Sequence, residues 1–252
     1  MTTLDSVDPR ASAALEPAAR ERLETLCAQL AGDPIQIRVL MPAAARLVGR
    51  GPLDPADPQG LLGATLDDAV RGALLVTLAG ALAGDTDRLV AEIRDLYRFG
   101  DADEKRAVLR ALHRLTPGPA YLDLVADALR TNDVRLVAAA LGPYGAKHLD
   151  AETWRQGVLK CLFVGVPLSA VAALDSRSDA LLADMIAAYV YERVAAGRDV
   201  PADVWRVLDV HPKAVEESGV LAELDSPYAD RRTAAERALA GRTDRATTGR
   251  EA

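Results

Sequence analysis

The chain has 252 residues, of which 50% are hydrophobic, 27% charged and only 4% aromatic. Such a composition excludes a disordered or fibrous protein and, with alanine and leucine supplying most of the apolar share, favours close-packed helices over sheets. The net charge of −7 at pH 7 opposes nonspecific binding to nucleic acid, which requires a basic surface.

The start of the chain, MTTLDSVDPR, has neither the basic nor the apolar region of a signal peptide, so we expect a cytoplasmic protein. The two cysteines, Cys27 and Cys161, lie far apart and show no pairing or metal-binding pattern. The longest apolar stretches, such as residues 73–83, are shorter than the roughly 20 residues that cross a bilayer. We therefore expect no transmembrane segment.

Helical spacing of leucines begins in residues 11–31 and is followed by Asp33 and Pro34, which suit the start of a second helix. Residues 35–39 alternate like a strand, but they are the only such segment, so we interpret them as the first turn of a helix to about residue 48. Residues 49–63, GRGPLDPADPQGLLG, contain four glycines and three prolines. This density predicts a loop and marks the best internal boundary.

Short helical segments separated by turns fill the rest of the chain. Thr65 fits the N-cap of the first, with Asp67 and Asp68 near its positive end. The expected helices are residues 65–83, 85–99, 101–115, 119–130, 132–141, 150–166, 178–196, 201–208, 213–224 and 227–240.

Short turns between helices are typical of antiparallel helix pairs that stack side by side. We therefore predict an all-α fold, an irregular HEAT-like helical repeat or α-solenoid, as one domain over residues 1–240. Its expected parts are N-terminal helices at 9–49, the loop at 49–63, a core at 64–212 and C-terminal helices at 213–240, before a disordered tail at 241–252.

Spacing motifs for phosphate-binding loops, dinucleotide sites, nucleophile elbows and zinc sites are absent from the sequence. The acidic groups near Asp54 and Asp101 are explained by the electrostatics of helix starts. His148 with Asp150 and Glu152 could hold a metal, although Asp150 equally fits a helix N-cap. We assign no catalytic residue, no metal ligand and no cofactor.

The most informative segment is residues 154–168, WRQGVLKCLFVGVPL. On a helix, one face carries Trp154, Val158, Cys161, Leu162 and Gly165. Gln156 and Lys160, four residues apart, form a polar pair beside that face. Lys160 either extends its ammonium to solvent or points into a pocket toward an anionic or carbonyl ligand.

Four segments carry a family resemblance, namely RTN at 130–132, GPYGA at 142–146, TWRQGVLKCLFVGVPL at 153–168 and YVYER at 189–193. In their order and spacing they resemble the EboA family of metabolite traffic proteins, which are helical and encoded in ebo clusters. This resemblance makes residues 64–212 an EboA-like core. Gly142, Gly145 and Arg155 depart from the family pattern.

The resemblance implies a non-catalytic adaptor that handles a lipophilic or aromatic secondary metabolite. Its implied partners are that metabolite and ebo-cluster proteins, namely a prenyltransferase-like membrane protein, a TatD-like hydrolase and sugar-phosphate enzymes. Two alternatives are a pure protein-protein scaffold and a lysine-dependent enzyme acting on a small carbonyl or phosphorylated metabolite. The candidate ligand-binding residues are Arg130, Asn132, Tyr144, His148, Trp154, Gln156, Lys160, Phe163, Tyr189 and Arg193.

Overall fold

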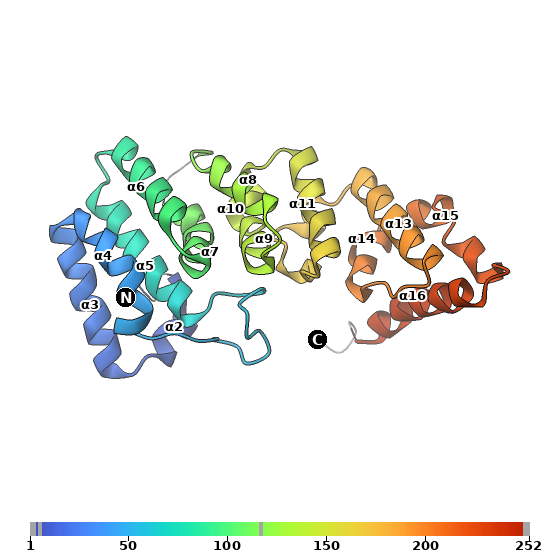
Figure 1. The fold of residues 1–252 in the computed structure, drawn as a ribbon, viewed down its shortest axis with the longest axis horizontal. Helices are drawn as coiled ribbons and strands as arrows, with labels where there is room; N and C mark the ends of the chain where they lie inside the picture. The colour runs from blue at the N-terminus through green and yellow to red at the C-terminus, as the bar shows by residue number, and fades with distance from the viewer. Residues whose placement is uncertain (1–3, 5–6, 116–117, 249–252) are drawn as a thin grey trace. The chain divides into compact units, whose positions relative to one another are not determined.

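A computed structural model describes residues 4, 7–115 and 118–248, with side chains described as far as residue 242. This part of the chain is all-α, as predicted, and contains no β-strand; an isolated bridge pairs Pro52 with Thr65. The chain divides into two compact units, Met1–Ala172 and Ala173–Ala252. They run from blue to yellow and from orange to red in Figure 1.

The first unit contains most of the helices. They are α2 (Pro9–Ala14), α3 (Pro17–Gly32), η1 (Pro34–Gln36), α4 (Ile37–Leu47), α5 (Leu66–Ala81), α6 (Thr86–Phe99), α7 (Ala102–Ala111), η2 (Leu112–Arg114), α8 (Leu122–Arg130), α9 (Val134–Ala140), α10 (Pro143–His148), α11 (Ala151–Val164) and η3 (Leu168–Ala170). The loop predicted at residues 49–63 separates α4 from α5.

The second unit packs around α13. Its elements are α12 (Leu174–Arg177), α13 (Ala180–Ala195), η4 (Ala202–Val204), α14 (Trp205–Leu208), α15 (Pro212–Glu217), η5 (Leu221–Asp225) and α16 (Ala229–Thr248). Trp205 is fully buried, and its indole N–H donates to the Ala238 carbonyl at 2.9 Å. The segment expected as a tail begins within α16, and its residues 249–252 lie outside the described residues.

No helix in the described part of the chain combines the length and hydrophobicity that crossing a membrane requires.

Three local predictions need correction. Residues 11–31 form two helices rather than one, because Pro17 starts α3 and the chain is extended at Leu15. The GPYGA segment, which lies outside the expected helices, is the helix α10, with Pro143 in its first turn, where a missing N–H costs nothing. Residues 167–177, which lie between two expected helices, contain η3 and α12.

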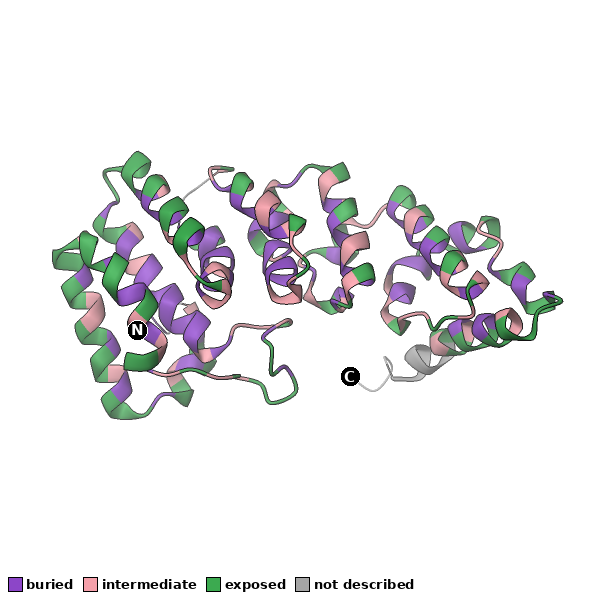
Figure 2. Cartoon of the chain, viewed as in Figure 1, coloured by how far each residue is buried: buried purple, intermediate pink, exposed green. Residues whose placement is uncertain are grey.

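Helix α5 lies at the centre of the first unit. It packs against α3, α4 and α7, and its Leu74, Leu75 and Leu78 are fully buried. Figure 2 shows buried residues along the sides of the helices that face their neighbours. This packing explains why one side of each helix is apolar, and burying a leucine contributes about 1.5–3 kcal/mol.

A buried ionic network joins the start of α5 to α7. The Nε of Arg106 donates to both oxygens of Asp68, at 2.9 and 2.8 Å, and these side chains are only 5% and 1% exposed. Another nitrogen of Arg106 donates to Thr65 Oγ1 at 3.1 Å. Thr65 and Asp68 form the predicted N-cap of α5, here a capping box. Arg71 donates to Asp67 at 2.9 Å in the same cluster.

The loop before α5 is held by the same region. The Asp57 carboxylate accepts hydrogen bonds from the backbone N–H groups of Leu61, Leu62 and Gly63, at 2.7–3.0 Å. Arg110 of α7 donates to the Gly60 carbonyl. The glycine- and proline-rich segment is therefore a folded loop that its own carboxylate and α7 keep in place.

We predict that Arg106→Leu lowers the free energy of unfolding by about 3–5 kcal/mol, because the buried Asp68 carboxylate loses the arginine that donates hydrogen bonds to it and keeps only Arg110, whose Nε lies 3.5 Å away. Urea denaturation followed by far-ultraviolet circular dichroism measures the change. The control is Arg130→Ala, which breaks an ion pair whose side chains are 69% and 45% exposed and should cost less than about 1 kcal/mol. Equal losses in the two variants would contradict the prediction.

Candidate functional site

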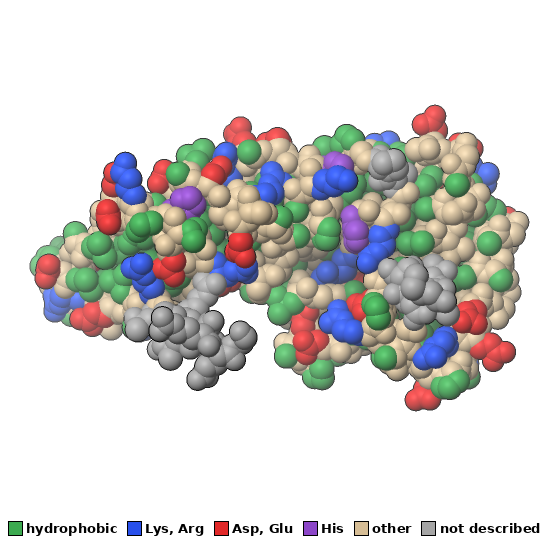
Figure 3. Space-filling model, turned by 180° about the vertical axis from the view of Figure 1, so that it is seen from behind, with side chains coloured by type: hydrophobic (Ala, Val, Ile, Leu, Met, Phe, Trp, Pro, Cys, Tyr) green, Lys and Arg blue, Asp and Glu red, His purple; other side chains and the backbone are tan. Residues whose placement is uncertain are grey.

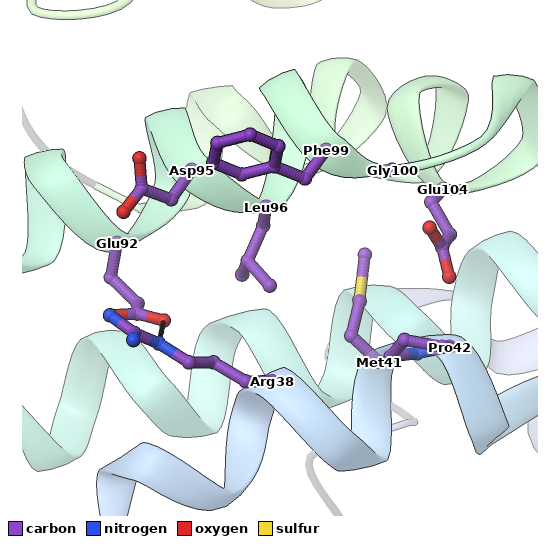
Figure 4. Close-up of a pocket in the computed structure, with 9 residues that line it drawn as sticks. All are labelled: Arg38, Met41, Pro42, Glu92, Asp95, Leu96, Phe99, Gly100 and Glu104. Atoms are coloured by element: carbon purple, nitrogen blue, oxygen red, sulfur yellow. Dashed lines mark hydrogen bonds and ion pairs between the residues drawn. The ribbon is translucent and has the colours of Figure 1, made fainter.

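A pocket of about 240 Å³ lies between α4, α6 and the start of α7. In Figure 4, Leu96 of α6 and Met41 of α4 point toward each other from opposite walls. Glu92, Leu96 and Phe99 share this side of α6 because they are spaced by four and three residues. The complete lining is Arg38, Met41, Pro42, Glu92, Asp95, Leu96, Phe99, Gly100 and Glu104.

The apolar part of the pocket remains open to solvent. Phe99, the last residue of α6, is 77% exposed even though it lines a cavity. Because most of this apolar ring stays in solvent, its burial contributes little to the free energy of folding. The Arg98 guanidinium lies 5.5 Å from the ring centre, and the rest of the exposed ring is available to a ligand that enters the pocket.

An ion pair closes one end of the pocket. Arg38 donates to the two oxygens of Glu92 at 2.7 and 2.8 Å, and this hydrogen-bonded pair raises the pKa of Arg38. The Glu92 side chain is only 10% exposed, whereas that of Arg38 is 56% exposed. The fork geometry fixes Glu92 and leaves Arg38 at the mouth of the pocket.

Two backbone features shape the pocket. Pro42 lies inside α4 and has no N–H, so the Arg38 carbonyl lacks the donor that a helix supplies from four residues later. At Gly100, a Cβ would lie 2.7 Å from the Leu96 carbonyl oxygen and 2.9 Å from the Glu104 carboxylate. Glycine is required there because Glu104 turns back to accept the Asp101 N–H and cap α7.

A second hollow, between α6 and α8, is lined by the other side of α6 and by the predicted residue Arg130. The buried Tyr97 donates its hydroxyl to Asp127 at 3.0 Å, and Arg130 donates to the other oxygen of Asp127 at 2.8 Å. Burial, and then the hydrogen bond to Asp127, raise the pKa of Tyr97. The phenol therefore acts as a neutral hydrogen-bond donor.

The predicted residues Tyr144 and His148 lie together on α10, with ring centres 4.6 Å apart. Tyr144 is 2% exposed; its hydroxyl accepts the Tyr121 N–H at 2.8 Å and donates to the Gly118 carbonyl at 3.1 Å. Burial raises the pKa of Tyr144. Its hydroxyl is thus engaged in holding the chain before α8.

The predicted residues of α11 lie on two different faces of the helix. Trp154 is 1% exposed and packs inward with Val158 and Cys161, as the periodicity predicted. Gln156 and Phe163 are exposed and Lys160 is partly exposed, and their spacing of four and three residues places them on one outer face. Asp150 caps the helix by accepting the Thr153 N–H at 2.9 Å, as predicted.

The remaining predicted residues are dispersed. Asn132 is exposed between α8 and α9. Tyr189 and Arg193 belong to α13 in the second unit, where the guanidinium of Arg193 lies 5.8 Å from the Tyr189 ring centre. Arg193 also donates to the Asp199 carbonyl.

The described residues contain no group of three or more His, Cys, Asp or Glu side chains that could hold a metal ion.

A family model described as the metabolite traffic protein EboA matches residues 62–209. The chain belongs to the EboA family. No curated protein and no solved structure matches the chain. The EboA match includes α6, α7 and α8, whereas the α4 wall of the pocket precedes it.

The sequence motifs did not point to the pocket between α4 and α6. Two features could have done so: Pro42 in the middle of a helical segment, and Phe99 at a polar helix end next to Gly100. Neither is required by the EboA-like motifs at 130–132, 142–146, 153–168 and 189–193, which lie elsewhere in the chain.

We predict that the wild-type protein loses more stability than Tyr97→Phe as the pH rises above about 10, the usual pKa of tyrosine. The folded state keeps the Tyr97 proton while the unfolded chain releases it, so the contribution is present below that pH and disappears above it. Urea denaturation across about pH 9–11 measures the difference, with Tyr228→Phe, at a 61% exposed tyrosine, as control. Parallel pH profiles for wild type and Tyr97→Phe would show the prediction to be wrong.

Proposed function

We propose that the chain is a non-catalytic ligand-binding adaptor that handles a lipophilic or aromatic metabolite, and that the metabolite binds between α4 and α6. The observation that carries this proposal is Phe99, which lines a cavity and yet is 77% exposed. Covering such a ring is worth about 1.5–3 kcal/mol, which a ligand would supply. The metabolite traffic family to which the chain belongs supports a small-molecule role.

The pocket indicates the size and polarity of the ligand. Its volume of about 240 Å³ is slightly below the roughly 300–1,000 Å³ of most small-molecule sites, which suits one or two rings. Met41, Pro42 and Leu96 supply apolar contact.

A lysine-dependent enzyme has less support. A lysine that acts as base or nucleophile needs burial or a neighbouring cation to favour its neutral form. Lys160 lies on the outer side of α11, between the exposed Gln156 and Phe163. This position suits contact with another molecule better than covalent chemistry.

A second candidate function is protein binding through the outer face of α11. Phe163 is 64% exposed, and Lys160 and Gln156 flank it on the same side. An exposed aromatic beside polar groups is typical of a protein contact. The partners would be ebo-cluster proteins in the cytoplasm, recognised by a HEAT-like stack of helix pairs.

The two sites can be separated because the chain contains only two phenylalanines, one at each. We predict that Phe99→Ala weakens binding of prodan, a neutral fluorescent dye with two rings, about tenfold, which corresponds to roughly 1.4 kcal/mol of lost apolar contact. Fluorescence titration measures the Kd. Phe163→Ala is the matched control, because it removes an exposed phenylalanine ring outside the pocket and should leave the Kd unchanged.

Loss of dye binding in Phe163→Ala alone would move the ligand site to α11. Unaltered binding in both variants would overturn the pocket proposal. Circular dichroism of both variants excludes a folding defect as the cause.

A further inference from the structure

The hollow between α6 and α8 has a volume of about 700 Å³ and a different character from the apolar pocket. Its lining includes four cationic side chains and three carboxylates, while the whole chain carries a net charge of −7. The two hollows adjoin, since Asp95 of α6 lines both. The partner of each charged side chain in this groove between α6 and α8 determines which charges can bind an anion.

Two of the three carboxylates are already neutralised. Asp123 accepts two hydrogen bonds from Arg94, at 3.1 and 3.2 Å. Asp127 accepts one from Arg130 and one from the Tyr97 hydroxyl. These pairs leave little negative charge on the α8 side of the groove.

Two of the four cations have no carboxylate partner among the described residues. Lys105 of α7 has its Nζ 5.3 Å from the centre of the Tyr97 ring, and Arg98 has its guanidinium 5.5 Å from the centre of the Phe99 ring. An aromatic face attracts a cation and holds it in position without cancelling its charge. Lys105 is therefore both oriented and available to an anion.

The remaining carboxylate does not reverse this balance. Asp95 is exposed at the edge that the groove shares with the apolar pocket. Asp95 carries one negative charge, whereas Lys105 and Arg98 carry two positive charges that no carboxylate among the described residues pairs with. The groove is therefore positive in a chain that is negative overall. A local field of this sign concentrates anions at the groove.

We propose that the groove between α6 and α8 binds the anionic group of a small molecule, a phosphate or a carboxylate, through Lys105 and Arg98. The lysine ammonium contributes three hydrogen-bond donors, and the arginine fork contributes paired donors. The inference does not require a ligand in the apolar pocket, although Phe99, whose ring holds Arg98, lines that pocket.

Calorimetric titration of the full chain with inorganic pyrophosphate at low salt tests the inference. Lys105→Met keeps the length of the side chain against Tyr97 but removes its charge, and should raise the Kd for pyrophosphate roughly tenfold. Lys213→Met is the matched control, because Lys213 is 81% exposed and pairs with Glu217 outside the groove. This control should bind as the wild type does, and raising the salt should weaken wild-type binding.

A parallel titration with succinate distinguishes the two anion classes. The anion with the lower Kd, pyrophosphate or succinate, identifies phosphate or carboxylate as the preferred group. Absence of binding by both anions, or equal loss of binding in Lys105→Met and Lys213→Met, would overturn the inference. Titration of the wild type with the two-ring dye prodan reports on the apolar pocket separately. Failure of the wild type to bind the dye while it binds pyrophosphate would thus refute only the function proposed above.

Discussion

The buried contact between Arg106 and Asp68 is the constraint on which the first unit depends. A charge this deeply buried is tolerated only with its partner in place, so the pair fixes how α5 and α7 lie against each other. Because Thr65 and Asp68 also cap α5, the same atoms that start one helix position another. Helix α6, which lies between α5 and α7 in the chain, packs against α7.

Helix α6 carries both candidate sites because one side of the helix is buried in the unit and the two neighbouring sides line the hollows. Leu89, Ile93 and Tyr97 are buried and attach the helix to the unit. The flanks on either side of this buried stripe are left for the two hollows, one apolar and one charged. Figure 3 shows basic and acidic side chains interspersed over the face that it draws, so local pairing rather than the overall charge decides where an anion can bind.

The sequence predicts features that depend on neighbours along the chain. The N-caps at Thr65 and Asp150 and the inward position of Trp154 follow from side-chain chemistry and helical spacing. The pocket depends instead on tertiary packing, since Arg38 and Glu92 are 54 residues apart. No local sequence pattern places Met41 opposite Leu96, so sequence motifs could not predict this site.

The aromatic residues show how folding and binding can be told apart in this chain. Five of the ten lie between residues 144 and 191, and the structure buries Tyr144, Trp154 and Tyr189 among them. Their clustering therefore reflects the core more than a ligand site. Both phenylalanines, by contrast, are mostly exposed, Phe99 beside a cavity and Phe163 on α11. An exposed phenylalanine ring is where another molecule would cover the most apolar surface, and the proposed ligand pocket and the proposed protein-binding face each contain one.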